Sequence, residues 1–310
     1  MMATYPHLET CTLELPDKWV DAWKFEKALV TCGDALGASY NTIVIRVPPG
    51  CKLMIDVIIR LLSFCNQAVV CTKRVRLEFG TDGNAMGYLN RIGFFDHLAP
   101  TVEVSPARPT YSGAAIHRGG NRGLVEIERF SRTAPVDQNL VPRLVAAVER
   151  GCAARADAKQ IGDAMFSIFG ELIKNVFDHS QTSLDAYAAL QTYPQGNSLT
   201  VAVSDSGIGI MRSLRPALTG SKWHNLSDVD LVVEIFREGI SSKPEDKRGL
   251  GLKSSAKHAI GFRADLDVRL LNQRVVLKPS NNEYQPNRAY SQEQLPLLWG
   301  THIAFSFKLN

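Results

Sequence analysis

The sequence predicts an α/β protein made of two domains. Strand and helix patterns alternate from residue 40 to residue 98, a stretch rich in proline and glycine follows, and the patterns resume at residue 124. A chain of 310 residues is long enough for two domains that each bury a full core. We therefore expect a small α/β domain over residues 1–98, a connector over 99–123 and a larger domain over 124–310.

The first domain shows a strand–helix–strand–helix pattern. The short β-branched stretch NTIVIRVP predicts a buried strand, and the apolar spacing of CKLMIDVIIRLLSFCNQAVV predicts a helix. RVRLEF alternates apolar and charged residues as a strand does, and GNAMGYLNRIGFFDHL predicts a helix broken at Gly93. Such a βαβα unit forms a small sheet with helices packed against it. In the connector, HRGGNRG allows an anion-binding nest, although a linker or hairpin turn is favoured.

The second domain is predicted to begin with a strand, LVEIERF, and two helices near residues 138–151 and 158–179. Two strands follow, LDAYAALQTY and NSLTVAVSD, joined by a turn at 194–197. A long polar segment over 211–248 leads to a helix that starts near Leu250. A hairpin within DLDVRLLNQRVVLK and a last strand, THIAFSFKL, complete the pattern.

The composition favours a soluble, cytoplasmic protein, with 45% hydrophobic and 21% charged residues. The start MMATYPHLETC has neither the basic nor the apolar region of a signal peptide, and no apolar run is long enough to cross a membrane. A net charge of +4 permits an anionic ligand such as a nucleotide but is too mild to indicate nucleic acid. The six cysteines show no CxxC pair and no Cys/His ligand spacing, so we expect reduced thiols and no cysteine metal site.

A polar stripe runs along the predicted helix that ends in FGELIKNVFDHS. Glu171, Asn175 and His179 are four residues apart, so an α-helix stacks them on one face beside its apolar face. The simplest interpretation is the solvent side of a surface helix, and only neighbouring motifs can favour a binding site.

Two glycine motifs follow this helix. DSGIGI stands directly after a strand, and Gly207 and Gly209 let the backbone turn sharply and approach a flat group, while the Asp205 carboxylate accepts a hydrogen bond from an amine. KRGLGLKSSAKHA holds Gly249 and Gly251 just before a helix, where free amide groups favour a phosphate. Each motif alone is weak, since turns and helix caps also contain such glycines. Neither is a Walker A loop or a dinucleotide fingerprint.

The ordered combination resembles the GHKL (Bergerat-fold) ATPase superfamily. E-x-x-x-N on a helix, D-x-G-x-G after a strand, G-x-G-L opening a helix and Gly-Thr starting the last strand come in the family's order over about 124–310. The family includes gyrase B subunits, ninety-kilodalton chaperones, histidine kinases, mismatch-repair ATPases and anti-sigma-factor serine kinases. The resemblance implies an α+β two-layer sandwich that binds ATP and Mg²⁺.

The resemblance also implies a role for each motif residue. Asn175 is the implied Mg²⁺ ligand, and Asp205 the acceptor for the adenine amine, with Thr301 supporting that contact. Glu171 is the implied general base toward water or a hydroxyl, with ordering of Mg²⁺-bound water as the alternative. His179 stays open between a phosphate or ribose contact and a helix-end histidine. The other implied nucleotide contacts are Gly207, Gly209, Ile210, Lys243, Arg248, Gly249, Leu250, Gly251 and Leu252.

Three functions fit these motifs. The first is a slow ATPase whose nucleotide lid, residues 211–248, controls protein contacts. The second is an anti-sigma-factor-like serine/threonine kinase in partner switching, and the third is a non-hydrolysing ATP sensor. The first domain is loosely similar to a STAS-like domain, but FGTDGNAMG has no serine at the phospho-acceptor place, although Thr81 is near. The expected partners are ATP, Mg²⁺ and a regulatory protein, and a homodimer is allowed.

Overall fold

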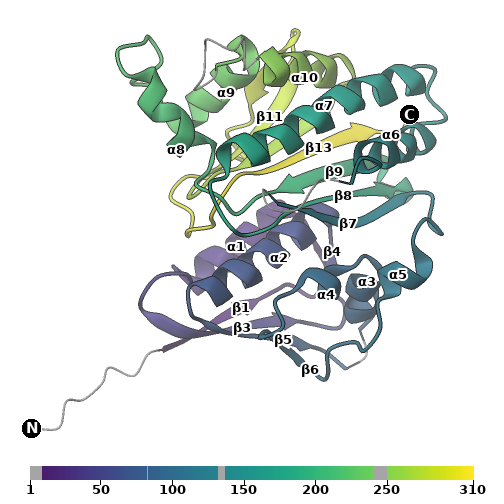
Figure 1. Cartoon of the computed structure of the whole chain (residues 1–310), viewed down its shortest axis with the longest axis vertical. Coiled ribbons are helices and arrows are strands. Elements are labelled where there is room, and N and C mark those ends of the chain that lie inside the picture. Colours follow the sequence, from purple (N-terminus) through teal and green to yellow (C-terminus); the bar gives the residue numbers. More distant parts are fainter. Residues whose placement is uncertain (1–8, 82, 132–136, 241–249) are drawn as a thin grey trace, which may run out of the picture.

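The computed structural model describes residues 9–81, 83–131, 137–240 and 250–310 of the chain. Among these residues the strands form a four-stranded parallel sheet, a seven-stranded antiparallel sheet and a two-stranded ribbon, so the α/β class is confirmed. Figure 1 shows the elements in layers: a group of helices, the antiparallel sheet, a second pair of helices and the parallel sheet.

The parallel sheet is built by the first third of the chain. Leu13, Ile45 and Leu77 pair across three of its strands and are fully buried, because alternate residues of a strand face the same side. The elements of this part are β1 (Glu9–Glu14), β2 (Trp19–Val20), α1 (Ala22–Cys32), β3 (Tyr40–Val47), β4 (Lys52–Leu53), α2 (Ile55–Val70), β5 (Arg74–Phe79), α3 (Ala85–Arg91), α4 (Phe94–His97), β6 (Glu103–Ser105) and α5 (Gly113–His117).

The predicted strands and helices of the first domain are confirmed, including the break at Gly93, whose φ of 88° lies in the left-handed region. The elements β1 and α1 were not predicted. The predicted boundary at residue 98 is too early, because β6 lies inside the predicted connector and pairs with β5 in the order β1-β3-β5-β6. The Glu103 carboxylate accepts hydrogen bonds from Arg74 at 2.8 Å and Arg76 at 3.0 Å, which fixes this strand to its neighbour.

The antiparallel sheet is built by the chain from residue 124 on, and the strands and helices predicted there are confirmed. Its strand order is β12-β11-β10-β13-β9-β8-β7, and four helices, α6, α7, α9 and α10, pack on one face. The elements are β7 (Leu124–Phe130), α6 (Leu140–Gly151), α7 (Ala158–His179), β8 (Ala186–Tyr193), η1 (Pro194–Gly196), β9 (Ser198–Ser204), α8 (Ile210–Leu214), η2 (Arg215–Leu218), α9 (Asp228–Glu238), α10 (Leu250–Gly261), β10 (Asp265–Arg269), β11 (Arg274–Ser280), β12 (Glu283–Pro286) and β13 (His302–Lys308).

The polar segment 211–248 contains a core helix, so the predicted lid is too wide. Leu231 and Ile235 of α9 are buried in the core shared with α10 and the antiparallel sheet. They stand one helical turn apart and give α9 an apolar face. The Ser227 hydroxyl caps this helix by accepting a hydrogen bond from the Asp230 amide at 3.1 Å. Residues 241–248 of the predicted lid lie outside the described residues.

Helix α2 lies between the two sheets and is buried on all sides from Ile55 to Ala68 (Figure 1). Its apolar residues share one core cluster with residues of both sheets, among them Ile45 in β3 and Ala202 in β9. A helix enclosed in this way has to satisfy its polar side chains inside the protein. The two halves of the chain therefore form one packed body.

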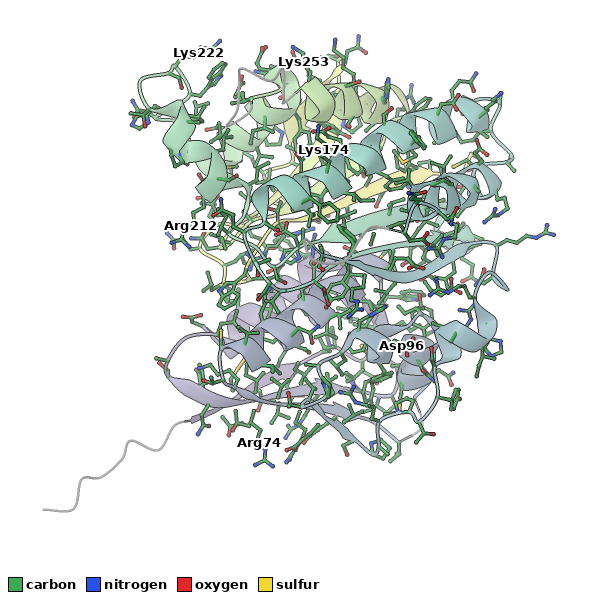
Figure 2. All side chains as sticks on the ribbon, in the orientation of Figure 1. Arg74, Asp96, Lys174, Arg212, Lys222 and Lys253 are labelled. Atoms are coloured by element: carbon green, nitrogen blue, oxygen red, sulfur yellow. A yellow bond between two sulfur atoms is a disulfide. The ribbon has the colours of Figure 1, made fainter. Side chains whose placement is uncertain are left out.

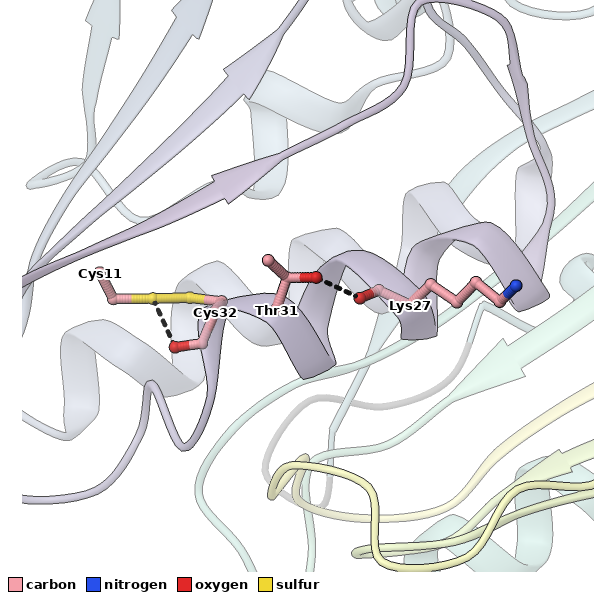
Figure 3. Close-up of a disulfide and its surroundings, with 4 residues drawn as sticks. All are labelled: Cys11, Lys27, Thr31 and Cys32. Atoms are coloured by element: carbon pink, nitrogen blue, oxygen red, sulfur yellow. Dashed lines mark hydrogen bonds between the residues drawn. A yellow bond between two sulfur atoms is a disulfide. The ribbon is translucent and has the colours of Figure 1, made fainter.

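The prediction of reduced thiols is wrong for one pair of cysteines. Figure 3 shows a disulfide between Cys11 in β1 and Cys32 at the end of α1, with Cα atoms 5.7 Å apart. This separation lies within the range that disulfides span. No motif links two cysteines 21 positions apart, and the packing of α1 against β1 brings them together. The remaining cysteines are free thiols: Cys51, Cys65, Cys71 and Cys152.

Candidate functional site

Asp205 occupies a buried position at the carboxyl end of β9. Its Oδ1 accepts a hydrogen bond from the Gly207 amide at 2.8 Å, and its Oδ2 accepts one from the Thr301 amide at 3.1 Å. The residue is 7% exposed, and this burial raises the pKa of its carboxyl to about 6, against the lowering effect of the two amide hydrogen bonds. Each carboxylate oxygen keeps a second lone pair, so Asp205 can accept one more hydrogen bond from a ligand.

Thr301, just before β13, is joined to the same loop. Its carbonyl accepts a hydrogen bond from the Asp205 amide at 3.1 Å, and its hydroxyl accepts one from the Ile210 amide at 2.9 Å. The hydroxyl hydrogen remains free to donate. Gly209 turns the loop with a φ of 80°, as its place in the motif predicts. Asp205 and Thr301 thus offer an acceptor and a donor close together, which suits a flat ligand with an amine beside a ring nitrogen.

Gly207 and Gly300 permit backbone approaches that a side chain would block. A Cβ at Gly207 would lie 2.1 Å from the carbonyl oxygen of Ser180, and a Cβ at Gly300 would lie 1.9 Å from the carbonyl oxygen of Asp205. The Ile208 amide also donates a hydrogen bond to the Ser180 carbonyl at 2.9 Å. The loop is therefore held directly against the C-terminal end of α7.

The polar stripe of α7 lies at the edge of the buried face of this helix. Glu171 and Asn175 are one turn apart and half-buried, beside the fully packed Leu172. Neither side chain makes a hydrogen bond or ion pair with any residue that the structure describes, so both are available to a ligand. Lys174, labelled on the same helix in Figure 2, is exposed. His179 ends α7, and its side chain lies outside the described part of the chain.

The first turn of α10 holds the last part of the second glycine motif, from Leu250 on. Leu250, Gly251 and Leu252 are helical, and α10 packs along α7 and α9. The side chains of these residues are outside the described part of the chain, so their phosphate contacts stay a prediction. Three further predicted contacts also lie outside the described residues: Lys243, Arg248 and Gly249.

Polar residues on α2 reach the site from the opposite face of the antiparallel sheet, and they were not predicted. Ser63 and Gln67 are four residues apart, hence on one face of the helix, and both are fully buried. The Ser63 and Ser204 hydroxyls form a hydrogen bond of 2.8 Å, and the side-chain amide of Gln67 donates hydrogen bonds to the Ser206 hydroxyl and the Trp299 carbonyl. Polar residues that recur with helical spacing in an apolar segment are the signal that could have revealed this face.

His302 connects two strands of the site and stays neutral. Its Nδ1 accepts a hydrogen bond from the Ser204 hydroxyl, and its Nε2 donates one to the Trp299 carbonyl at 3.1 Å. Burial, reinforced by the charges of Arg60 and Arg269, lowers the pKa of the imidazole well below its ordinary value. His302 is therefore a structural bridge and carries no proton at neutral pH beyond the one on Nε2.

A cavity of about 250 Å³ lies away from this site. It opens between the ribbon β2–β4, α3 and β8, and its lining includes Trp19, Leu53, Tyr88 and Gln191. None of the predicted site residues lines it, so the cavity and the loop at Asp205 are separate features.

Comparison of the chain with protein-family models, with curated proteins and with solved structures finds no match. Within the described residues no helix is both long and apolar enough to cross a membrane.

Proposed function

We propose that the protein is a cytoplasmic ATP-binding protein of the GHKL (Bergerat-fold) type over residues 124–310, which hydrolyses ATP slowly with Mg²⁺. One observation carries this proposal: the buried Asp205 carboxylate ends a strand, keeps free lone pairs and stands beside Thr301. The antiparallel sheet with α7 and α10 on one face supports the fold assignment. In the proposed complex Asp205 accepts a hydrogen bond from the adenine amine, and Thr301 donates to a ring nitrogen.

The half-buried side chains of Glu171 and Asn175 on α7 support the proposed binding of Mg²⁺ and the phosphates. No group of three or more His, Cys, Asp and Glu in the described residues could hold a metal ion. Asn175 would be the protein ligand of Mg²⁺, which takes its other oxygens from water and phosphates and neutralises their charge. Glu171, one turn before Asn175, would accept the proton of the attacking water. Amide groups at the start of α10 would hold phosphate oxygens.

Calorimetry with ATP and Mg²⁺ tests the binding site. Wild-type protein should bind, Asp205→Asn should bind at least about a hundredfold more weakly, and Asn175→Ala should lose the dependence on Mg²⁺. Asn in place of Asp205 keeps one acceptor oxygen instead of two, so its NH₂ group faces either the adenine amine or one of the two backbone amides that now bond Asp205. Lys174→Ala is the matched control beside Asn175, since Lys174 is exposed, and should bind like wild type. Equal affinity of Asp205→Asn and wild type for ATP would contradict the assignment of Asp205 as the acceptor for the adenine amine.

The fate of the γ-phosphate separates the three candidate functions. An ATPase releases inorganic phosphate, and Glu171→Gln should lower that rate at least about a hundredfold while ATP still binds. Label from γ-³²P ATP that appears on a STAS-type partner protein instead of in solution would favour the serine/threonine kinase. ATP binding with neither release nor transfer would favour the sensor.

A further inference from the structure

We propose that Gln67 of α2 is a positioning residue of the nucleotide site, so that the N-terminal part of the chain belongs to that site. This inference rests on the proposed function, because it concerns how tightly the same pocket holds ATP. Gln67 has a relative exposure of 0% and lies on the opposite face of the antiparallel sheet from α7. It acts through Ser206, which follows Asp205, and through Trp299, which stands two residues before Thr301.

The amide of Gln67 joins the two segments that carry Asp205 and Thr301 and that would form the base pocket of the proposed complex. Its Nε2 donates to the Ser206 hydroxyl at 2.9 Å and to the Trp299 carbonyl at 3.0 Å. Its Oε1 accepts a hydrogen bond from the Trp299 amide at 2.9 Å. Ser206 follows Asp205 directly, and Trp299 stands two residues before Thr301. One buried side chain therefore fixes both halves of the acceptor–donor pair.

A second connection from α2 runs parallel to the first. Ser63, one helical turn before Gln67, hydrogen-bonds the Ser204 hydroxyl at 2.8 Å. Ser204 donates onward to Nδ1 of His302, whose Nε2 donates to the Trp299 carbonyl at 3.1 Å. Through Ser63 and Gln67 together, α2 anchors the residues before and after Asp205 and both sides of Thr301.

This anchoring bears on affinity because backbone amides orient the Asp205 carboxylate and the Thr301 hydroxyl. The Thr301 amide has to stay at 3.1 Å from Asp205 Oδ2 for the carboxylate to keep its orientation. If the segment at Trp299 moves, the Asp205 carboxylate and the Thr301 hydroxyl are no longer aligned with each other. Their hydrogen bonds to the edge of the adenine ring then become weaker. We expect the preference for ATP over GTP to fall, because Asp205 accepts a hydrogen bond from the amine of adenine and guanine carries a carbonyl at the same place.

The neighbouring residue supplies a matched control. Asn66 is also a buried amide on α2 with the same hydrogen-bond pattern. Its Nδ2 donates to the His97 carbonyl at 3.0 Å and the Tyr187 hydroxyl at 2.8 Å, and its Oδ1 accepts from the Ala99 amide at 2.9 Å. None of these partners belongs to the base pocket. Asn66→Leu and Gln67→Leu should therefore cost similar stability and differ only in their effect on the nucleotide.

The experiment compares full-length wild type, Gln67→Leu and Asn66→Leu by thermal unfolding and by titration with ATP and GTP in the presence of Mg²⁺. Both variants should lower Tm. Gln67→Leu should raise the Kd for ATP about tenfold and reduce the preference for ATP over GTP, the effect of losing well-oriented hydrogen bonds. Its rate of phosphate release at saturating ATP should stay within about twofold of wild type, since Glu171 and Asn175 lie on α7. Asn66→Leu should keep the wild-type Kd and preference.

Equal effects of the two variants on Kd, or an unchanged Kd and preference in Gln67→Leu, would overturn the inference. If Gln67→Leu fails to fold, Ser206→Ala decides, because it removes one hydrogen-bond partner of Gln67 and leaves the bonds between Gln67 and Trp299 in place. It should raise the Kd for ATP about threefold, and an unchanged Kd would count against the role of Gln67. Failure of the proposed function looks different, since wild type itself would then bind no ATP, or Asp205→Asn would bind as well as wild type.

Discussion

The buried carboxylate of Asp205 favours binding of an amine but lowers the stability of the unliganded protein. A carboxylate in a residue only 7% exposed costs free energy in the unliganded protein, yet it is the group that prepares the loop for an amine. Burial raises its pKa from 3.8 to about 6, so the folded state binds this proton more tightly than the unfolded chain does. The contribution of Asp205 to the free energy of unfolding therefore falls as the pH rises from about 4 to about 6, and the cost persists above that range.

Asp205→Asn should remove this cost, because an amide carries no charge, although one of the two acceptor oxygens is lost with it. Urea denaturation at pH 8 should show the variant more stable than wild type, by at most about 3 kcal/mol for a shift of about two pKa units. The difference should shrink as the pH is lowered from about 6 to about 4, where the wild-type carboxyl is already protonated in the folded state. A variant that is less stable than wild type at pH 8 would mean that the two amide hydrogen bonds outweigh desolvation.

At the scale of elements, a buried group of charges fixes α1 and α2 to β10 and β11. Arg60 Nη2 donates to Asp267 Oδ1 at 2.6 Å, and Arg274 Nε donates to Asp267 Oδ2 at 2.9 Å. Arg269 Nε donates to Glu26 Oε1 at 3.0 Å. Burial alone would raise the pKa of the Asp267 carboxyl, but the attraction of Arg60 and Arg274 outweighs it and holds the pKa at about 2.

Asp267→Asn should lower the free energy of unfolding by about 3–5 kcal/mol, because it removes the charge that the buried guanidinium groups of Arg60 and Arg274 share, and Arg60 keeps only the longer ion pair with Glu26 at 3.7 Å. Asp265→Asn is the control on the same strand, since Asp265 pairs with Lys278 in an exposed salt bridge and should change stability by less than about 1 kcal/mol. The depressed pKa of Asp267 means that its stabilisation is present above 3.8 and is lost as the pH falls through about 2. Denaturant titrations at pH 7 and pH 3 measure both effects, and equal losses in the two variants would contradict the assignment.

For the whole molecule, the two sheets share α2 as a common core element. Residues of β7, β8, β9 and β13 belong to the same apolar cluster as α1, α2 and the parallel sheet. Neither part of the chain can keep that core alone, because separation would expose the face of the antiparallel sheet that α2 covers and the side of α2 that faces this sheet.

Unfolding should accordingly be one cooperative transition, with equal calorimetric and van't Hoff enthalpies. A chain cut to residues 124–310 should expose the face of the antiparallel sheet beneath α2, bind the dye ANS and aggregate, whereas the full chain should do neither. Two resolved transitions in the full chain, or a soluble and natively folded truncated chain, would show that the halves are independent.

Most of the elements of this protein follow from local patterns in its sequence. RVRLEF alternates apolar and charged residues and forms β5, and the predicted helix at 158–179 is α7. Such elements are predictable because helical and strand periodicity depends on neighbours in the chain. The contact between Asp205 and Thr301 was implied by the resemblance of the motifs and not by any local pattern, and the structure joins the two residues by hydrogen bonds.

Local patterns account for most of the strands and helices and for the class of chemistry that the motifs suggest, but not for β1, α1, β6 or α9. The packing of distant segments joins β6 to the parallel sheet, brings Cys11 to Cys32 and encloses α2 between two sheets. It also decided that Gln67 reaches Ser206, 139 residues further along the chain. The physical reason is that burial on every side of α2 is set by residues far away in sequence, so no local pattern tells a polar residue at a wet surface from one enclosed in the core.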